Sequence, residues 1–191
     1  MEEKTIQIKK AKLSKGGCVE ASYIDSDGNE ITLKGKNKCH NDLKVALSAL
    51  VPYFTDLTEQ KESDKIDWSN LESAENVDLL RKLDVTGLSI GGDNNNRIIT
   101  MSGRRTLITS RVLNLNAPGV EMDSETFEWS HIDDFDLAVQ DFIYEVKEYI
   151  LNRKWEVVQP SLFDGDPDDP FAGADAPDEV PSIESPADNV A

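Results

Sequence analysis

The sequence predicts an α+β fold in which antiparallel strands are covered by two helices and followed by a disordered acidic tail. Three observations predict it. Short segments alternate apolar and polar residues, as strands with one buried face do. Two longer segments carry apolar residues three or four positions apart, as amphipathic helices do. Residues 156–191 hold six of the eight prolines and no Lys or Arg, a composition typical of disorder.

The strand pattern occurs in two parts of the chain. In residues 4–36 it is clearest at Val19, Ala21, Tyr23, Ile31 and Leu33. Residues 25–29 (Asp-Ser-Asp-Gly-Asn) lie between these positions and predict a hairpin turn, in which Gly28 supplies a positive φ. Further strands are predicted at about 83–91, 97–103, 107–115 and 124–129.

The helix pattern also occurs twice. The first predicted helix, 41–58, has its apolar stripe at Leu43, Leu47, Leu50, Phe54 and Leu57. Pro52 removes a backbone donor, so it should kink or divide this helix. The second, 131–153, has its stripe at Ile132, Phe135, Val139, Phe142, Val146 and Tyr149, and Ser130 with Asp133 has the spacing of a capping box. Residues 59–76 are polar and predict a connector with a short helical turn at most.

This order indicates one globular domain, 1–155, and a tail, 156–191. Strands followed by a helix occur in both halves, about 1–61 and 77–155, which raises the hypothesis of an internal duplication. Of the 37 acidic residues, ten lie in the tail, so residues 1–155 keep 27 acidic against 20 basic residues. The net charge of −17 therefore belongs largely to the tail.

Several protein classes are excluded by composition. No apolar run approaches the roughly 20 residues that cross a bilayer, and the N-terminus has no basic start and apolar stretch of a signal peptide. Two cysteines cannot form a disulfide scaffold. We therefore expect a cytoplasmic protein without a membrane partner, in the host bacterial cytoplasm if it is encoded by a phage.

The most informative motif stands at the start of the tail. Residues 159–163 read Gln-Pro-Ser-Leu-Phe and resemble the bacterial sliding-clamp-binding peptide, Gln-x-Ser/Asp-Leu-Phe. The resemblance implies that Leu162 and Phe163 fill an apolar pocket of the clamp, with Gln159 as a polar contact and Ser161 on the turn side. Pro160 stands where the family often has an aliphatic residue.

Two other interpretations of the tail remain open. Val157, Val158, Leu162 and Phe163 could instead fold back onto the domain as an edge strand. Residues 168–171, Asp-Asp-Pro-Phe, are similar to the acidic tip of bacterial single-stranded-DNA-binding proteins, but Phe171 is followed by twenty residues where the family ends in Phe. The alternative without a binding function is that residues 168–171 belong to a solvated acidic spacer.

Basic residues of the domain gather on the predicted strands. If they share one face, they form a stripe that attracts phosphate groups. The candidate nucleic-acid contacts are Lys9, Lys10, Lys12, Lys34, Lys36, Arg97, Arg104 and Arg105. Ordinary solvated strand faces are the alternative.

Catalytic and metal-binding motifs are missing from the sequence. The acidic openings at 25–29 and 164–168 lack the glycine and glutamate of a calcium loop, and Cys39-His40 has no second ligand pair at suitable spacing. His40 and His131 are the only histidines that could act as general bases, and neither stands in a nucleophile motif. We expect no enzyme, no cofactor and no metal, with Cys39 as a small buried residue.

These observations lead to one leading hypothesis. We expect the chain to be a non-enzymatic accessory protein of bacterial or phage DNA replication or recombination, which docks on the sliding clamp through its tail. Its domain would bind single-stranded DNA or another replication protein, and docking could either recruit the protein or inhibit the clamp. The alternative is an acidic inhibitor that mimics DNA and engages a DNA-binding or defence enzyme. A virion component has no positive support, and the oligomeric state is open.

Overall fold

The computed structural model describes residues 5–93, 96–122 and 128–156 of the chain. The chain divides into two units, Met1–Val157 and Val158–Ala191, and the second lies wholly outside the described residues. The expected disorder of the tail therefore stays a prediction.

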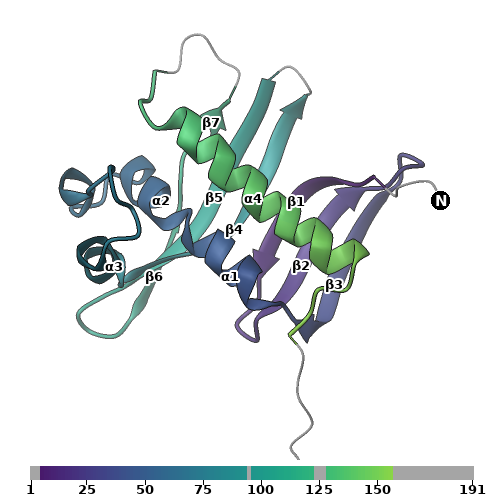
Figure 1. The fold of residues 1–191 in the computed structure, drawn as a ribbon, viewed down its shortest axis with the longest axis horizontal. Helices are drawn as coiled ribbons and strands as arrows, with labels where there is room; N and C mark the ends of the chain where they lie inside the picture. Colours follow the sequence, from purple (N-terminus) through teal and green to yellow (C-terminus); the bar gives the residue numbers. More distant parts are fainter. Residues whose placement is uncertain (1–4, 94–95, 123–127, 157–191) are drawn as a thin grey trace, which may run out of the picture. The chain divides into compact units, whose positions relative to one another are not determined.

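One antiparallel sheet carries the fold, with strand order β3-β2-β1-β4-β5-β6 and a short β7 paired with β5 (Figure 1). Its strands are β1 (Gln7–Leu13), β2 (Cys18–Ile24), β3 (Glu30–Lys38), β4 (Leu83–Asp93), β5 (Asn96–Thr106), β6 (Val112–Asn116) and β7 (Val120–Glu121). The first three strands and the next three each form a meander. The two meanders join through β1 and β4, in three residue pairs centred on Ala11 and Leu88. The predicted α+β class is thereby confirmed.

Local chemistry explains the hairpin between β2 and β3. Gly28 has a φ of 84°, as the turn requires. The Asp25 carboxylate accepts hydrogen bonds from the backbone N–H groups of Asp27 (3.0 Å) and Asn29 (2.8 Å). These bonds close the turn as an Asx turn and set the register of the two strands.

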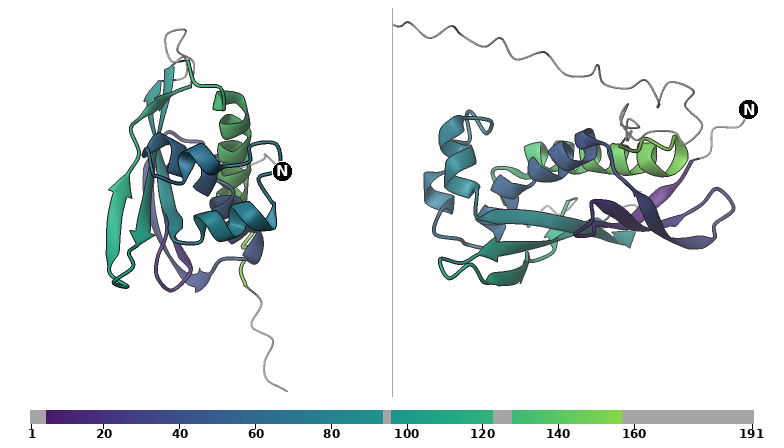
Figure 2. Two further views of the ribbon diagram at one scale, coloured as in Figure 1. Left: turned by 90° about the vertical axis from the view of Figure 1, so that its left-hand side faces the viewer. Right: turned by 90° about the horizontal axis from the view of Figure 1, so that it is seen from below.

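The helices lie on one side of the sheet (Figure 2). They are α1 (Asn41–Ser48), α2 (Val51–Leu57), α3 (Ala74–Leu80) and α4 (Ile132–Leu151), with a 3-10 turn, η1 (Ser63–Lys65). The predicted helix 41–58 is divided in two, as Pro52 suggested. Pro52 lies in the first turn of α2, where its missing N–H has no helical partner to lose. His40 caps α1, since its Nδ1 accepts from the backbone N–H of Asp42 at 3.3 Å.

The longest helix, α4, runs across the sheet from β5 towards β3. Near its start Asp136 pairs with Arg97 of β5, and near its end the Tyr149 hydroxyl donates to the Asn37 carbonyl at 2.7 Å. Between α4, α2 and the sheet lie the largest fully buried side chains, among them Phe54, Phe135 and Phe142. The apolar stripe predicted for this helix is therefore the centre of the core.

Two local predictions were wrong, and a third lies mostly outside the described residues. Residues 107–111 form a hairpin loop instead of the start of a strand, because the Leu107 N–H donates to the Arg111 carbonyl and Ser110 has a φ of 60°. Of the predicted strand 124–129, residues 124–127 lie outside the described part, so this prediction is not tested there, and Trp129 packs on Tyr53 and Phe135. The residue that caps α4 is His131, without a side-chain cap bond, and not Ser130.

Within the described residues, no helix is long and apolar enough to cross a membrane.

Candidate nucleic-acid interface

Alternation along the strands gives the sheet two different sides. Ile8, Ala11, Val19 and Ala21 are buried beneath the helices, and the positions between them point away from the helices. We call this second side the outer sheet face, and its members used below are Lys10, Lys12, Glu20, Ser22, Thr32, Lys34, Lys36, Asp84, Ser89, Thr100, Ser102 and Arg104. In Figure 2 the described helices all lie on the other side. The outer sheet face is thus available as a binding surface.

Two rows of side chains cross this face from strand to strand. In the first row, Lys34 of β3 pairs with Glu20 of β2, and Glu20 pairs with Lys12 of β1. The row continues through Gly87 of β4 to Ser102 of β5. The second row runs parallel to it and consists of Thr32, Ser22, Lys10, Ser89 and Thr100. The first row therefore has its lysines at one end and a hydroxyl group at the other, and the second row has one lysine between two pairs of hydroxyl side chains.

Three lysines surround the single carboxylate of these rows. Lys12 Nζ lies 2.9 Å from Glu20 Oε2. The pKa of Glu20 is held below its ordinary value by this hydrogen bond first, and by the charges of Lys12, Lys34 and Lys10. Lys10, Lys12 and Lys34 also line a shallow hollow of ≈ 190 Å³ together with Glu20, Ser22 and Thr32. The local charge is positive, which suits a phosphate group.

The remaining predicted contacts of the N-terminal meander lie on or beside this face. Lys36 is exposed two positions beyond Lys34 on β3. Lys9 is half-buried at a β-bulge between Ile8 and Lys10. Within the described residues, no carboxylate oxygen lies within 4.0 Å of the nitrogens of Lys10, Lys34 or Lys36.

The arginines of β5 do not form one stripe with these lysines. Arg104 is on the outer sheet face, where its Nη2 lies 2.6 Å from Asp84 Oδ2. Arg105 follows directly in the strand and so points to the helical side, as does Arg97. Consecutive residues of a strand face opposite sides, so the expectation of a shared face was wrong for Arg97 and Arg105.

Arg105 and Arg97 instead tie the helical layer to the sheet. Arg105 donates to both carboxylate oxygens of Glu62 (2.6 and 2.7 Å) and to Gln60 Oε1 (2.9 Å). The hydrogen bonds from Arg105 hold the pKa of Glu62 below its ordinary value of 4.5. Both side chains are nearly buried, at 13% and 11% exposed. These arginines have a structural role that the sequence did not reveal.

Other candidate residues are placed as follows. Cys39 is fully buried, as expected. His131 stacks on Trp68 with ring centroids 3.5 Å apart, so it belongs to an aromatic cluster with Tyr53 and Trp129. Among the described residues, no group of three or more His, Cys, Asp or Glu side chains could hold a metal ion. Gln159, Ser161, Leu162 and Phe163 lie outside the described residues.

Sequence reasoning missed the hydroxyl groups of the outer sheet face. Ser22, Thr32, Ser89, Thr100 and Ser102 stand at the polar positions of alternating strands, which is the signal that could have found them. No aromatic side chain occupies an outer position of the described strands, since Tyr23 lies on the helical side beside Ile31 and Ile150. The face can therefore contact phosphate and sugar groups but offers no platform for base stacking.

Comparison of the chain with protein-family models, with curated proteins and with solved structures gave no match.

Proposed function

We propose that this protein is a non-enzymatic accessory protein of bacterial or phage DNA replication. Its outer sheet face binds the backbone of single-stranded nucleic acid. The observation that carries the proposal is the pair of cross-strand rows in which Lys10, Lys12 and Lys34 converge. Positive charge beside small hydroxyl groups is the chemistry of sequence-independent backbone contacts.

The second part of the proposal is a tether. The pentapeptide 159–163 follows the described domain within a few residues and resembles a clamp-binding motif. A weak linear motif raises the local concentration of the attached domain at its target, without requiring a tight interface of the domain itself. On this proposal the clamp holds the domain near the single-stranded DNA at a replication fork.

The DNA-binding part is tested by titrating a labelled 20-nucleotide oligo-dT with the full chain and recording fluorescence anisotropy over a range of salt. The test variant is Lys10→Gln with Lys34→Gln. The matched control is Lys65→Gln with Lys82→Gln, which removes the same charge from exposed lysines outside the outer sheet face. We expect the test variant to lose at least fivefold in affinity and the control to lose less than twofold.

The salt dependence gives a second, independent readout. For single strands the slope of log K against log salt changes by about 0.7 per phosphate neutralised, so the test variant should flatten it by about 1.4. Equal losses in the two double variants, or no binding of the wild-type chain at 50 mM salt (about a third of physiological ionic strength), would contradict the proposal.

The tether is tested separately with a labelled peptide of residues 155–167 and a bacterial sliding clamp. We expect saturable binding at micromolar strength, which is lost in a peptide carrying Leu162→Ala and Phe163→Ala. A peptide that does not bind would remove the clamp from the proposal and favour the interpretation of these residues as an edge strand.

The DNA-mimic hypothesis has one observation in its favour, the carboxylates of α4. Of the six carboxylates on α4, two are neutralised within the domain, because Asp136 pairs with Arg97 and Glu145 pairs with Lys154. Lys154 Nζ also lies 2.6 Å from Asp42 Oδ2. A decoy needs ordered, unpaired carboxylates, and these ion pairs reduce the number that α4 can present, so this second candidate ranks below binding of nucleic acid by the outer sheet face.

A further inference from the structure

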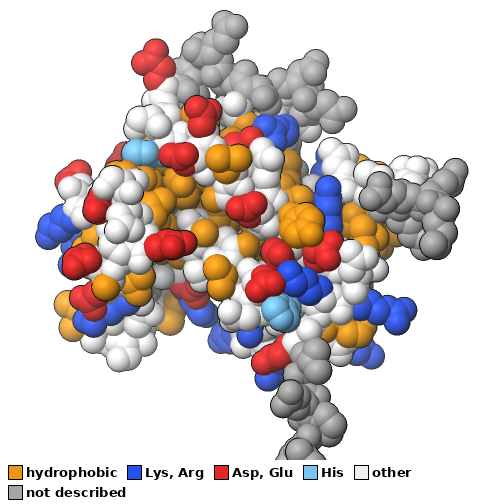
Figure 3. All heavy atoms as spheres, in the orientation of Figure 1, with side chains coloured by type: hydrophobic (Ala, Val, Ile, Leu, Met, Phe, Trp, Pro, Cys, Tyr) orange, Lys and Arg blue, Asp and Glu red, His pale blue; other side chains and the backbone are white. Residues whose placement is uncertain are grey.

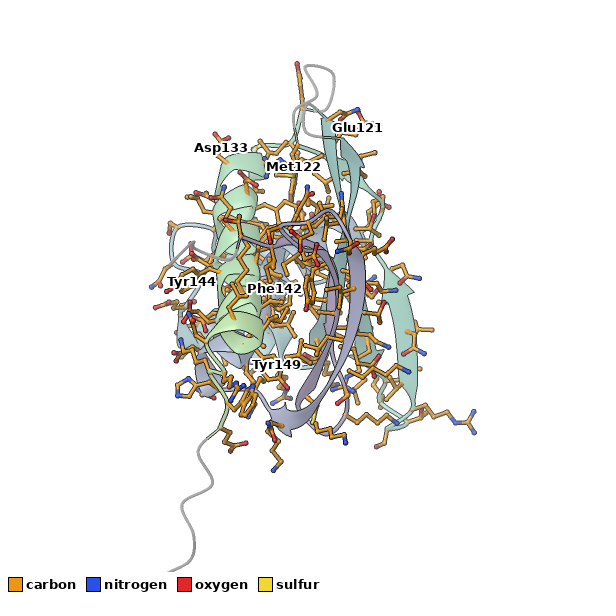
Figure 4. The ribbon with its side chains drawn as sticks, turned by 90° about the vertical axis from the view of Figure 1, so that its right-hand side faces the viewer. Glu121, Met122, Asp133, Phe142, Tyr144 and Tyr149 are labelled. Atoms are coloured by element: carbon orange, nitrogen blue, oxygen red, sulfur yellow. The ribbon has the colours of Figure 1, made fainter. Side chains whose placement is uncertain are left out.

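The outward side of α4 carries a row of large apolar side chains that the core does not use. The inward side is formed by Phe135, Val139, Phe142, Val146 and Tyr149, all buried. On the outward side, Leu137 is 60%, Tyr144 59% and Leu151 37% exposed. Figure 4 shows Phe142 pointing to the sheet and Tyr144 pointing away from it. Leu137, Tyr144 and Leu151 are called the α4 row below.

The spacing of the α4 row matches one side of a helix pair. Its members are seven residues apart, so they lie on one line along the helix at intervals of about 10.5 Å. The row supplies one apolar position per heptad, and the positions three residues on, Gln140 and Lys147, are polar, so a second helix would pack along this single line. At the C-terminal end, Tyr144 and Leu151 also line a hollow of ≈ 470 Å³ with Ile6 and the side chains of Lys147, Glu148 and Asn152. The C-terminal part of the row thus borders a hollow.

The charges beside the α4 row indicate which kind of partner helix could pack on it. Asp133, Asp134 and Asp141 are exposed on α4, Glu148 is half-exposed beside the row, and Lys147 is the one basic residue of this helix. Figure 3 shows carboxylates interspersed with apolar side chains over the helical side of the molecule. A second copy of α4 would bring carboxylates against carboxylates, in a chain whose net charge is already −17. Nucleic acid would be repelled in the same way.

We propose that the α4 row and its flanking carboxylates bind a basic amphipathic helix of a partner protein. The apolar stripe of that helix packs on Leu137, Tyr144 and Leu151, and its Lys or Arg side chains meet Asp134 and Asp141. This is the helix-in-groove mode of recognition, in which anchors supply affinity and flanking charges supply selectivity. The α4 row lies on the side of the sheet opposite the outer sheet face, so the partner helix and nucleic acid can be bound at the same time.

The test uses the full chain and a labelled 21-residue peptide of three heptads, with Leu at the first and fourth positions and Lys or Ala elsewhere. A second peptide has the same composition in an order without an apolar stripe, and a third carries Glu in place of Lys. Anisotropy at physiological salt should give binding of the patterned Lys peptide at least tenfold tighter than of either other peptide. Equal binding of the two Lys peptides would show that net charge alone explains the binding, and it would overturn the proposal.

Variants of the chain locate the site. Leu137→Ser with Tyr144→Ser should weaken binding of the patterned peptide at least tenfold. Val77→Ser with Ile108→Ser, which removes apolar side chains exposed elsewhere, should change it less than twofold. Asp134→Asn with Asp141→Asn keeps the row and should weaken binding about threefold. Circular dichroism verifies that each variant is folded.

Two results would overturn the site. One is unchanged binding by the Leu137→Ser, Tyr144→Ser variant. The other is a dimeric mass of the wild-type chain by light scattering that becomes monomeric in this variant, because the row would then be covered by a second copy.

Discussion

Met101 and Ser102 are neighbours on β5, yet they meet different surroundings. Met101 is buried under the helices, and Ser102 is exposed on the outer sheet face. The same contrast runs through β1, where Ala11 is buried between the exposed Lys10 and Lys12. One side of each strand thus supplies the stability of the domain, and the other is free to carry charge for binding. Substitutions on the two sides should therefore affect different measurements.

The largest expected effect separates the two sides of α4. Phe142→Ala should lower the free energy of unfolding by about 3–5 kcal/mol, because it opens a cavity where the fully buried ring packs against the sheet. Tyr144→Ala, two residues away and 59% exposed, should change it by less than about 0.5 kcal/mol. Urea denaturation followed by circular dichroism measures both. Similar losses in the two variants would show that Tyr144 has a stabilising partner in the folded chain.

A smaller effect separates two glycines of adjacent strands. A Cβ at Gly103 would lie 2.6 Å from both the Phe54 ring and the Asp84 carbonyl oxygen, so Gly103→Ala should destabilise the domain by about 1–3 kcal/mol. A Cβ at Gly91 would meet its nearest atom only at 3.9 Å. Gly91→Ala should therefore be neutral or stabilising, by up to about 1 kcal/mol. Thermal melts of both variants measure this difference. If Gly91→Ala lowered the melting temperature and Gly103→Ala did not, the packing of Phe54 against β5 would be contradicted.

The ion pair of Arg105 and Glu62 predicts a dependence on pH. The folded-state pKa of Glu62 lies below its unfolded value, so the pair stabilises the fold above about pH 4.5 and this contribution is lost as the pH falls through the folded pKa. Glu62→Gln should lower the free energy of unfolding at pH 7 by about 1–2 kcal/mol, since Gln60 still accepts from Arg105.

The control for the Glu62→Gln prediction is the dependence of the stability difference on pH. The difference in urea midpoint between wild type and Glu62→Gln should shrink steadily between pH 5 and pH 3, a range around the ordinary carboxyl pKa. A difference that is constant over this range would mean that Glu62 acts through packing and not through its charge.

Periodicity predicted the parts of the fold that depend on local sequence. The stripes at Leu43–Leu57 and Ile132–Tyr149 became helices, and Pro52 divided the first. Helix α3 was missed although it has a local cap, because the Ser73 side chain accepts from the backbone N–H of Asn76. The side chain of Asn76 is buried and donates to the backbone carbonyls of Asp67 and Asn70. The capping serine at Ser73 is the signal in residues 59–76 that could have found the helix.

The candidate site was predicted only in part. Alternation is local and places the lysines of the outer sheet face at the polar positions of β1 and β3, but the sequence left open whether the two sets share one face, which the pairing of both strands with β2 decides. The continuation of the rows into β4 and β5 requires the pairing of Lys10 with Ser89, far apart in the chain, which no local pattern specifies. The separation of Arg97 and Arg105 from the lysines likewise depends on distant partners, because Arg97 bonds Asp136 and Arg105 bonds Glu62 on the helical side.

The smallest expected effect on stability belongs to the outer sheet face itself, and it sharpens the contrast with the helical side most directly. Glu20→Gln removes the one carboxylate among Lys10, Lys12 and Lys34. Its ion pair with Lys12 is exposed to solvent, and such pairs contribute little, so the urea midpoint should not change measurably. Affinity for oligo-dT should instead rise about two- to threefold, the effect of removing one unit charge about 6 Å from a phosphate in water. The gain should shrink as salt is raised, because exposed charges are screened. A variant that loses stability but gains no affinity would assign Glu20 to the fold, and with it the outer sheet face to structure and not to binding.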